Sequence, residues 1–481
     1  MPVRNRTRFF IVAAVLAALI FATVFAIAIP RRSGEHATAS TTRTAGDPDL
    51  GVGSDEGVEG DEVETAAAER ARDELRGGRT DLTRIQAAPA PGWAGETILG
   101  GGDDDWEPAI AADPSSPYVY VMYNRFGGAK ACQHCPSPAM LVQVSSDGGA
   151  TFGPQRFLCT CSGVGSQYDP VLAVTSSGTV YATWMNVSRI MFSSSTDHGT
   201  TWTTPLQVSG KQWADKQWMG ISGNGTDVYI AYESRSSLQI TSSHDGGTTF
   251  STPITVNSDT GHYRYPNGFV VLPGGTAILA DSSYPNGSGT SSGTVDIEIW
   301  RSTNGGGSWT RTAVDAVTTG VDFNTSSTTT IAADPSGALV LEYGGATVVG
   351  SNGHIYVRRS SDQGLSWSAR TVLTPGTGNA SFPAEASSGG GAFVALWQES
   401  RAGVWNTYVR TSTDGGVTWT PEVRISDATS GAPYVSAAGY AAPYGDYGMM
   451  AVTSAGKAIA VWGEGASFSI GPGGVWINRQ T

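Results

Sequence analysis

The sequence predicts an all-β fold made of repeated four-stranded units, and three observations support this prediction. An eight-residue phrase, Ser-x-Asp/Asn-x-Gly-x-Ser/Thr-aromatic, occurs six times at intervals of 48 to 59 residues. Short β-like runs flank each copy, and no long stretch beyond the N-terminal region has helical periodicity. The 481 residues include 63 glycines, and only 15% are charged, which suits short strands joined by tight turns. A repeat of this period indicates stacked supersecondary units or a β-propeller.

Turn chemistry explains the residue type at each defined position of the repeated phrase. The central acid or amide can accept hydrogen bonds from backbone N–H groups of its own turn. The glycine two positions later permits positive φ, and the final aromatic ring can cover the hairpin. We therefore interpret the central residues as structural: Asp147, Asp197, Asp245, Asn304, Asp362 and Asp414.

The phrase resembles the Asp-box, also called the BNR repeat, of the sialidase superfamily and related propellers. The resemblance covers residues 95–481, and six copies in one chain make it specific. It implies a β-propeller whose boxes lie on the face away from the active site.

The number of blades follows from the strands that surround the boxes. One β-like run leads directly into each box, two further runs lie ahead of it and one follows the box, which gives the four strands of a propeller blade. Six boxes would fit six blades, but the C-terminal segment adds three runs without a box, at 449–453, 458–462 and 475–478. The orphan run Glu96–Leu99 could pair with 475–478 and complete a seventh blade that leaves no free edge. We predict seven blades, with six as the alternative.

The N-terminal region predicts a membrane anchor and a linker. Arg4, Arg6 and Arg8 precede the apolar run Phe9–Ile29, whose 21 residues can span a bilayer core of about 30 Å. An uncleaved signal anchor (residues 1–32) fits this length better than a cleaved signal peptide. Residues 33–94 read as an acidic, disordered linker, and residues 95–481 as the propeller. The basic flank predicts that the propeller is extracellular, or secreted if the segment is cleaved.

Candidate functional residues gather where the innermost strands are expected to begin, at the mouth of the propeller channel. Four carboxylates lie at similar positions there: Glu107, Asp169, Asp215 and Asp446. Aromatic residues stand beside them: Trp106, Tyr168, Trp218, Tyr263 and Tyr265. Carboxylates can bind sugar hydroxyls and rings can cover sugar C–H faces, and paired carboxylates serve glycoside hydrolysis. Alternatively, the acids bind Ca²⁺, or they bond to backbone N–H groups of neighbouring blades or to Lys216.

The resemblance implies further catalytic residues: an arginine triad, an acid/base Asp and a Tyr activated by Glu. The first blade opens with Glu107, where the family motif has an arginine, and the nearest match is Arg264 in the fourth blade. The other candidate arginines are Arg125, Arg235 and Arg401. The candidate catalytic set is therefore Asp169, Asp215, Arg264, Asp446 and Tyr447.

Two function hypotheses follow from these residues. One arginine motif does not make a triad, so a neutral glycan or a cation suits this mouth better than an anionic sugar. The first hypothesis is a sialidase-like propeller that binds or hydrolyses a glycan or glycoconjugate. The alternative is a non-catalytic propeller that holds a protein partner at the cell surface. A net charge of −13 without a basic surface argues against a nucleic-acid partner.

The four cysteines fall in two loops of the first blade, Cys132 with Cys135 and Cys159 with Cys161. Outside the cytoplasm such a cluster predicts two disulfides, although the connectivity cannot be read from the sequence. A four-cysteine metal site assisted by His134 is the alternative.

Overall fold

The computed structural model describes residues 85–86, 88–100, 103–126, 135, 137–158, 165–257, 259, 261–285, 294–318, 328–430, 432–468 and 471–481. Its regular elements are strands, numbered β1 to β32. The predicted anchor and nearly all of the predicted linker lie outside these residues. Within the described ranges, no helix has the length and apolar character needed to cross a membrane.

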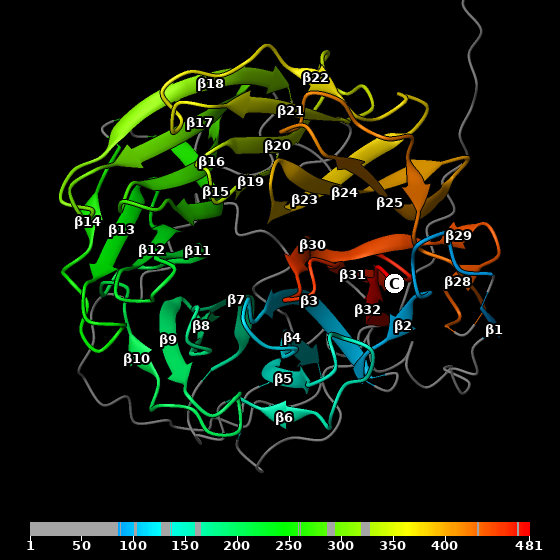
Figure 1. The fold of residues 1–481 in the computed structure, drawn as a ribbon, viewed down its shortest axis with the longest axis horizontal. Coiled ribbons are helices and arrows are strands. Elements are labelled where there is room, and N and C mark those ends of the chain that lie inside the picture. The colour runs from blue at the N-terminus through cyan, green and yellow to red at the C-terminus, as the bar shows by residue number, and fades with distance from the viewer. Residues whose placement is uncertain are drawn as a thin grey trace, which may run out of the picture. The chain divides into compact units, whose positions relative to one another are not determined.

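Seven four-stranded blades form a closed ring around a central axis (Figure 1). Each innermost strand contacts the innermost strands of the two neighbouring blades, including the first and the last. This arrangement confirms the predicted all-β fold with seven blades.

Blades 1 to 3 comprise β3 (Asp104–Ala112), β4 (Val119–Phe126), β5 (Ala139–Ser145) and β6 (Arg156–Phe157); β7 (Gln167–Val174), β8 (Val180–Asn186), β9 (Arg189–Ser195) and β10 (Leu206–Gln207); and β11 (Asp215–Ile221), β12 (Val228–Glu233), β13 (Leu238–Ser243) and β14 (Ile254–Thr255).

The remaining blades follow the same order, except that the last one draws a strand from each end of the propeller. Blades 4 to 7 comprise β15 (His262–Val271), β16 (Ala277–Pro285), β17 (Thr294–Ser302) and β18 (Thr310–Thr318); β19 (Thr329–Ala333), β20 (Leu339–Gly345), β21 (His354–Ser360) and β22 (Thr371–Val372); β23 (Asn379–Gly389), β24 (Ala392–Arg401), β25 (Val404–Ser412) and β26 (Val423–Arg424); and β30 (Ala442–Val452), β31 (Ala458–Gly465), β32 (Gly473–Arg479) and β2 (Thr97–Ile98). Short strands β28 (Val435–Ser436) and β29 (Gly439–Tyr440) extend the sheet of blade 6, and β1 (Ile85–Gln86) pairs with β27 (Ala428–Ser430).

The ring closes as the sequence predicts. Thr97 pairs with Ile477 and Ile98 with Trp476, so β2 is the outer strand of blade 7. Trp93 forms a further bridge with Gln480, within the segment that the sequence assigns to the linker. Closure of this kind pairs a strand edge that would otherwise be exposed.

The core lies between neighbouring blades, because each blade buries both faces of its inner strands. Every residue of β4, β12 and β31 is buried. The contact between blades 5 and 6 shows the pattern: Val340 and Ala332 pack in one cluster with Phe393 and Trp397. Each large apolar side chain buried in this way contributes about 1.5–3 kcal/mol.

The six repeated phrases connect the third and fourth strands of blades 1 to 6, and their hydrogen bonds match the predicted turn chemistry. In the first box, Ser145 Oγ donates to Asp147 Oδ1 at 2.7 Å, and the N–H of Thr151 donates to the same oxygen at 2.9 Å. The Thr151 hydroxyl, which donates to Asp147 Oδ2 at 2.6 Å, and these two bonds lower the pKa of Asp147 to about 2. The N–H of Gly148 also donates to Pro117 O, in the turn after β3, at 2.8 Å. The boxes therefore lie where the innermost strands end. We call this the box end, and the end where those strands begin the mouth end.

Candidate functional site

β-Bulges shape the mouth end of the innermost strands. In β3, β7 and β11, pairing with the second strand skips two residues, which begin with Glu107, Asp169 and Lys216 respectively. These three residues have positive φ, at 51°, 54° and 48°. A bulge turns side chains away from the regular alternation of a strand, and positive φ at a non-glycine residue costs roughly 1–3 kcal/mol. In β30, the skipped segment is longer and includes Asp446 and Tyr447.

The bulges bring four charged residues together, which we call the acid–lysine cluster: Glu107, Asp169, Lys216 and Asp446. Carboxylate oxygens of the three acids lie within 4.8 Å of one another. Lys216 Nζ lies 2.6 Å from Asp446 Oδ2 and 3.8 Å from Asp169 Oδ1. All four side chains are buried, although Asp446 at 7% is more exposed than the others at 1%. The cluster joins blades 1, 2, 3 and 7.

Neutral polar and aromatic groups hold the cluster in place. Asn124 Nδ2 donates to Glu107 Oε2 at 2.8 Å, and the backbone N–H of Asp169 donates to the same oxygen at 3.0 Å. The Tyr265 hydroxyl donates to Asp446 Oδ2 at 3.0 Å. Lys216 Nζ also lies 5.5 Å from the ring centroids of Tyr265 and Tyr447, within the range of cation–π attraction.

Burial raises the pKa values of three groups in and beside the cluster. Burial raises the pKa of Asp169 to about 8, although the charge of Lys216 opposes the shift. Burial, followed by the charges of Asp169 and Asp446, raises the pKa of Glu107 well above its usual range. Burial also raises the pKa of Tyr447. At neutral pH, Asp169 therefore holds a proton, and Lys216 and Asp446 form the shortest charge pair of the cluster.

The donor set does not fit the Ca²⁺ ion that the sequence allowed at this mouth. Calcium takes six to eight oxygen ligands. Here three acids bring one carboxylate oxygen each within 4.8 Å of one another, and the ammonium group of Lys216 is already 2.6 Å from one of them, Asp446. Lys216 thus provides the positive charge beside Asp446 that a metal ion would otherwise provide.

Two of the predicted catalytic residues lie outside the cluster because they precede the bulges. Asp215 pairs in the regular ladder with Glu233, and its Oδ1 accepts the N–H of Lys216 at 2.6 Å. Arg264 is fully buried in blade 4. Its guanidinium lies 2.6 Å from Asp259, 2.8 Å from Glu298 and 3.1 Å from Asp281. The placement of Arg264 differs from the expectation that it lies with the acids of the mouth, whereas Asp215 remains close enough for its charge to raise the pKa of Asp169.

Most of the predicted binding aromatics are core residues. Trp106 lies 5.3 Å from Phe126 and 5.6 Å from Tyr444 between ring centroids, and it is 1% exposed. Tyr168 and Tyr263 are buried as well. Trp218 is partly exposed, and its ring centroid lies 6.3 Å from that of Tyr447.

The other candidate arginines are bound within their own blades or lie at the surface. Arg125 binds Asp105 through two hydrogen bonds of 2.6 and 2.8 Å. Arg401 lies 2.6 Å from Glu399 and is also paired with Glu422. Arg235 is exposed. Among the described residues, these arginines do not converge into a triad.

Only one of the four cysteines in the disulfide prediction lies among the described residues. Cys135 is buried and disulfide-bonded. Cys132, Cys159 and Cys161 lie outside the described residues, so the predicted pairing of two disulfides stays a prediction.

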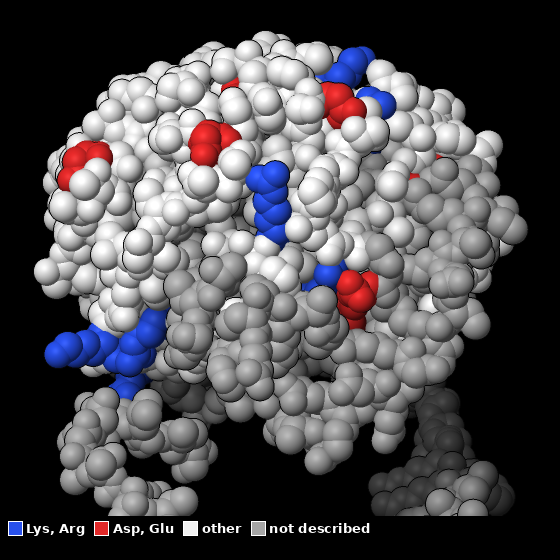
Figure 2. Space-filling view, turned by 90° about the horizontal axis from the view of Figure 1, so that it is seen from below, with Lys and Arg blue, Asp and Glu red and all other residues white. Residues whose placement is uncertain are grey.

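Charges on the described surface are sparse. Figure 2 shows one side of the molecule, on which charged side chains are few, some of them lie side by side, and most of the described surface is uncharged. That side has no continuous basic stripe among its described residues, of the kind that neutralises a nucleic-acid backbone.

Lys216 is the residue that sequence reasoning placed least well, since it entered only as a possible partner of the acids. A signal was present. Glu107 and Asp169 each precede a proline, and aligning Lys216-Gln217 with these pairs places Lys216 at the bulge position.

Comparisons with known proteins agree with this architecture. The sequence model of the BNR repeat-like domain matches residues 125–276 and 284–439. A search of curated proteins found no significant match. Among solved structures, the chain is similar to the intramolecular trans-sialidase of Ruminococcus gnavus, with 14% identity over 82% of this chain and 98% of that chain, at a TM-score of 0.42.

Two further structures are similar at the same level. An ulvan polysaccharide lyase shares 12% identity over 79% of this chain and 95% of its own, at a TM-score of 0.49. The α-L-arabinanase of Penicillium chrysogenum shares 13% identity over 83% and 98%, at a TM-score of 0.42. Likeness at these values carries no argument about this chain. The family match covers more than half of the sequence, and the chain, a seven-bladed propeller, therefore belongs to the BNR repeat-like domain family.

Proposed function

We propose that the protein is an extracytoplasmic, membrane-anchored propeller that binds a neutral carbohydrate at its mouth end and hydrolyses a glycosidic bond there. The observation that carries this proposal is the convergence of Glu107, Asp169 and Asp446, whose oxygens lie within 4.8 Å of one another. In glycosidases that retain anomeric configuration, the two carboxyl groups are about 5–5.5 Å apart. The close spacing of these acids fits that class.

The protonation states divide the chemical roles. Asp169 holds a proton at neutral pH, so it can donate that proton to the departing glycosidic oxygen. Asp446 is the more exposed acid and is paired with Lys216, so its carboxylate can attack or stabilise the anomeric carbon. Water then releases the sugar, and Asp169 takes the water proton. Lys216 and Tyr265 position Asp446 by donating to the same oxygen, Oδ2.

The charge balance favours a neutral sugar over an anionic one. Lys216, the lysine of the cluster, is already paired with Asp446. Arg264 and Arg125 are occupied by acids of their own blades. These three cationic groups are therefore already paired, and an anionic sugar would have to compete with carboxyl groups for them. The membrane anchor rests on the apolar run Phe9–Ile29 and the basic residues that precede it.

A second candidate function is a non-catalytic propeller that holds a protein partner. One observation favours it: the acid–lysine cluster is between 1% and 7% exposed, as a set of residues that only ties blades together would be. The experiment below separates the two candidates.

The test uses the full chain in detergent micelles, on a glycan array and on a panel of 4-nitrophenyl glycosides. We expect cleavage of a neutral glycoside, with kcat reduced about 10²- to 10⁴-fold by Asp446→Asn or Asp169→Asn. Asp414→Asn, at the box end, should leave kcat per folded molecule unchanged. Neither binding nor cleavage of any glycan would support the scaffold function. Sialoside cleavage that Arg264→Ala abolishes would contradict the preference for neutral sugars.

A further inference from the structure

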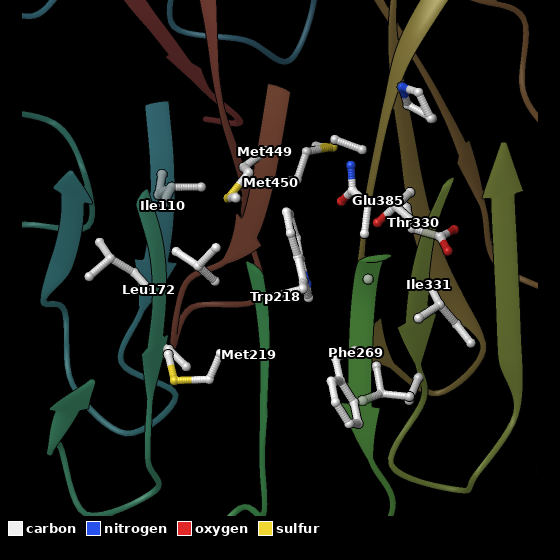
Figure 3. Close-up of a pocket in the computed structure, with 18 of the residues that line it drawn as sticks. Ile110, Leu172, Trp218, Met219, Phe269, Thr330, Ile331, Glu385, Met449 and Met450 are labelled. Carbon is white, nitrogen blue, oxygen red and sulfur yellow. The ribbon is translucent and has the colours of Figure 1, made fainter. Parts of the chain in front are cut away.

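The outer sugar residues of a glycan bound at the acid–lysine cluster have to extend across the mouth end and not down the channel. On the box-end side of the cluster, the channel contains a cavity of about 350 Å³ (Figure 3), lined mainly by apolar side chains such as Leu172, Met219 and Phe269. Sugar hydroxyls placed there would exchange water for apolar neighbours, which is unfavourable. Contacts at the mouth end therefore select which glycan is accepted.

Three basic residues belong to neighbouring connections at the mouth end of blades 2 and 3: Arg189, Lys211 and Arg235. Arg189 begins β9, Lys211 lies between β10 and β11, and Arg235 follows β12. Lys211 and Arg235 are exposed, and Arg189 is partly exposed. Among the described residues, none of the three forms an ion pair. Asp215 and Glu233, the nearest acids to Lys211 and Arg235 in the sequence, are buried, so they leave the surface charge positive.

Hydrogen bonds fasten the loop that carries Lys211 to both neighbouring connections. On one side, Arg189 Nη1 donates to Gln212 O at 3.0 Å. On the other side, the buried Ser234 hydroxyl donates to Trp213 O at 2.6 Å. Figure 2 shows basic side chains side by side at the lower left of its view, with no acidic side chain next to them. The cations thus stand on connected backbone that is already fixed before a ligand binds.

Trp213 adds an aromatic surface between these cations. It is partly exposed, and it packs against the apolar cluster that contains Tyr263 and Tyr265. Because Trp213 lies three residues before Lys216, at most about 11 Å of extended chain separates it from the acid–lysine cluster. An aromatic ring can cover the C–H face of a sugar, and cations bind carboxylate or sulfate groups through charge-assisted hydrogen bonds. The position suits a sugar residue next to the one held at the cluster.

We propose that a rim patch made of Arg189, Lys211, Trp213 and Arg235 binds a sugar residue that carries a carboxylate or sulfate group. The anionic group lies against the cations, and the sugar ring packs on Trp213. The substrate class is therefore an acidic polysaccharide in which a neutral sugar, held at the cluster, is joined to an anionic one. The inference rests on the proposed function for the position of the cleaved sugar, whereas binding at the rim patch is measured without cleavage.

The probes are two matched pairs of hexasaccharides, titrated by calorimetry into the full chain in detergent micelles. One pair is unsulfated chondroitin and its carboxyl methyl ester, and the other is κ-carrageenan and its desulfated form. We expect the acidic member of at least one pair to bind about tenfold more tightly than its neutral partner, since each exposed ion pair contributes up to about fivefold. The pair that shows the preference identifies the anionic group. Raising the salt from about 50 mM to about 500 mM should remove most of it, because exposed charges are screened.

The double variant Lys211→Gln with Arg235→Gln should bring the affinities within that pair to within about twofold of each other. The matched control is Lys457→Gln with Arg301→Gln, which removes two charges at the box end and should keep the preference. Trp213→Leu retains an apolar side chain without the aromatic face, and it should weaken both members of the pair about fivefold.

Equal affinities within both pairs would overturn the proposal, as would a preference that survives in the double variant of Lys211 and Arg235. Polyglutamate that binds as tightly as the acidic hexasaccharide, with no effect of Trp213→Leu, would indicate a surface for acidic peptides and overturn it too. The 4-nitrophenyl glycosides carry one sugar and report on the cluster alone. If they are cleaved while neither pair shows a preference, the rim patch is refuted and the proposed hydrolysis stands. If the preference is present and depends on the rim patch while no glycoside is cleaved, the hydrolysis is refuted and the rim patch stands.

Discussion

Replacing Asp169 with asparagine should flatten the dependence of stability on pH. The folded-state pKa of Asp169 is about 8 because the carboxyl group is buried, whereas an unfolded aspartate titrates near 3.9. Between these values, the folded protein binds one more proton than the unfolded chain. The free energy of unfolding therefore falls as pH rises through this window, and the stabilising proton is lost above about pH 8.

The size of this change in the free energy of unfolding follows from a difference of one bound proton between the folded and unfolded states. A difference of one bound proton changes the free energy of unfolding by about 1.4 kcal/mol per pH unit, so the parent protein should lose about 2.7 kcal/mol between pH 5 and pH 7 through this group. Asparagine has nearly the same shape, tolerates the positive φ of 54° and does not titrate. The variant lacks this contribution, while buried acids elsewhere contribute to both proteins.

The measurement is urea unfolding at pH 5, 6 and 7, followed by tryptophan fluorescence. The stability of Asp169→Asn relative to the parent should rise by about 2.7 kcal/mol across this range. Asp414→Asn is the control. The pKa of Asp414 is lowered to about 2, so it is ionised in both states and its variant should parallel the parent. If Asp169→Asn also runs parallel to the parent, Asp169 is ionised in the folded protein and cannot be the proton donor.

Three further variants test the framework that carries the site. Asp414→Ala should lower the melting temperature, since Ser412 Oγ and the N–H of Thr418 lose their acceptor; unchanged melting would contradict a structural role for the boxes. Deletion of residues 93–98 should lower it as well, because it removes β2 and exposes β32; a silent deletion would mean that closure contributes no stability. Arg264→Met should cost about 3–5 kcal/mol in urea unfolding, because it leaves buried acids unpaired, whereas the half-exposed Arg311→Met should cost less than about 1 kcal/mol. Equal costs would argue that the buried network is not a pairing of charges.

The fold could be predicted because the residues that define each Asp-box lie close together in the sequence. Each Asp-box satisfies its own turn within eight residues, so the phrase is recognisable without knowledge of the rest of the chain. Counting strands between boxes then left one strand at each end unpartnered. Since an unpaired edge is unfavourable, these two had to meet, as Thr97 and Ile477 do.

The site was harder to predict because side-chain direction depends on bulges. A shift of one residue in a strand moves a side chain to the opposite face. Asp215 and Lys216 are adjacent, yet Asp215 stays in the regular ladder and Lys216 enters the cluster. Arg264 likewise precedes the bulge of its strand, so it faces acids within blade 4. Composition and spacing place all three residues at the mouth end but do not separate their directions.

Bulges also explain why the two ends of the channel differ in chemistry. Proline cannot donate to a sheet ladder, and it follows the bulge residues Glu107, Asp169 and Phe382. In blade 6 the bulge residue is Phe382, which is apolar. The charged groups of the acid–lysine cluster come from blades 7, 1, 2 and 3. Beyond the bulges, Glu385 of blade 6 bonds to its neighbouring blade, since its Oε1 accepts the N–H of Ala332 at 2.8 Å. The register breaks in β3, β7, β11 and β30 thus place the acid–lysine cluster on one side of the mouth end.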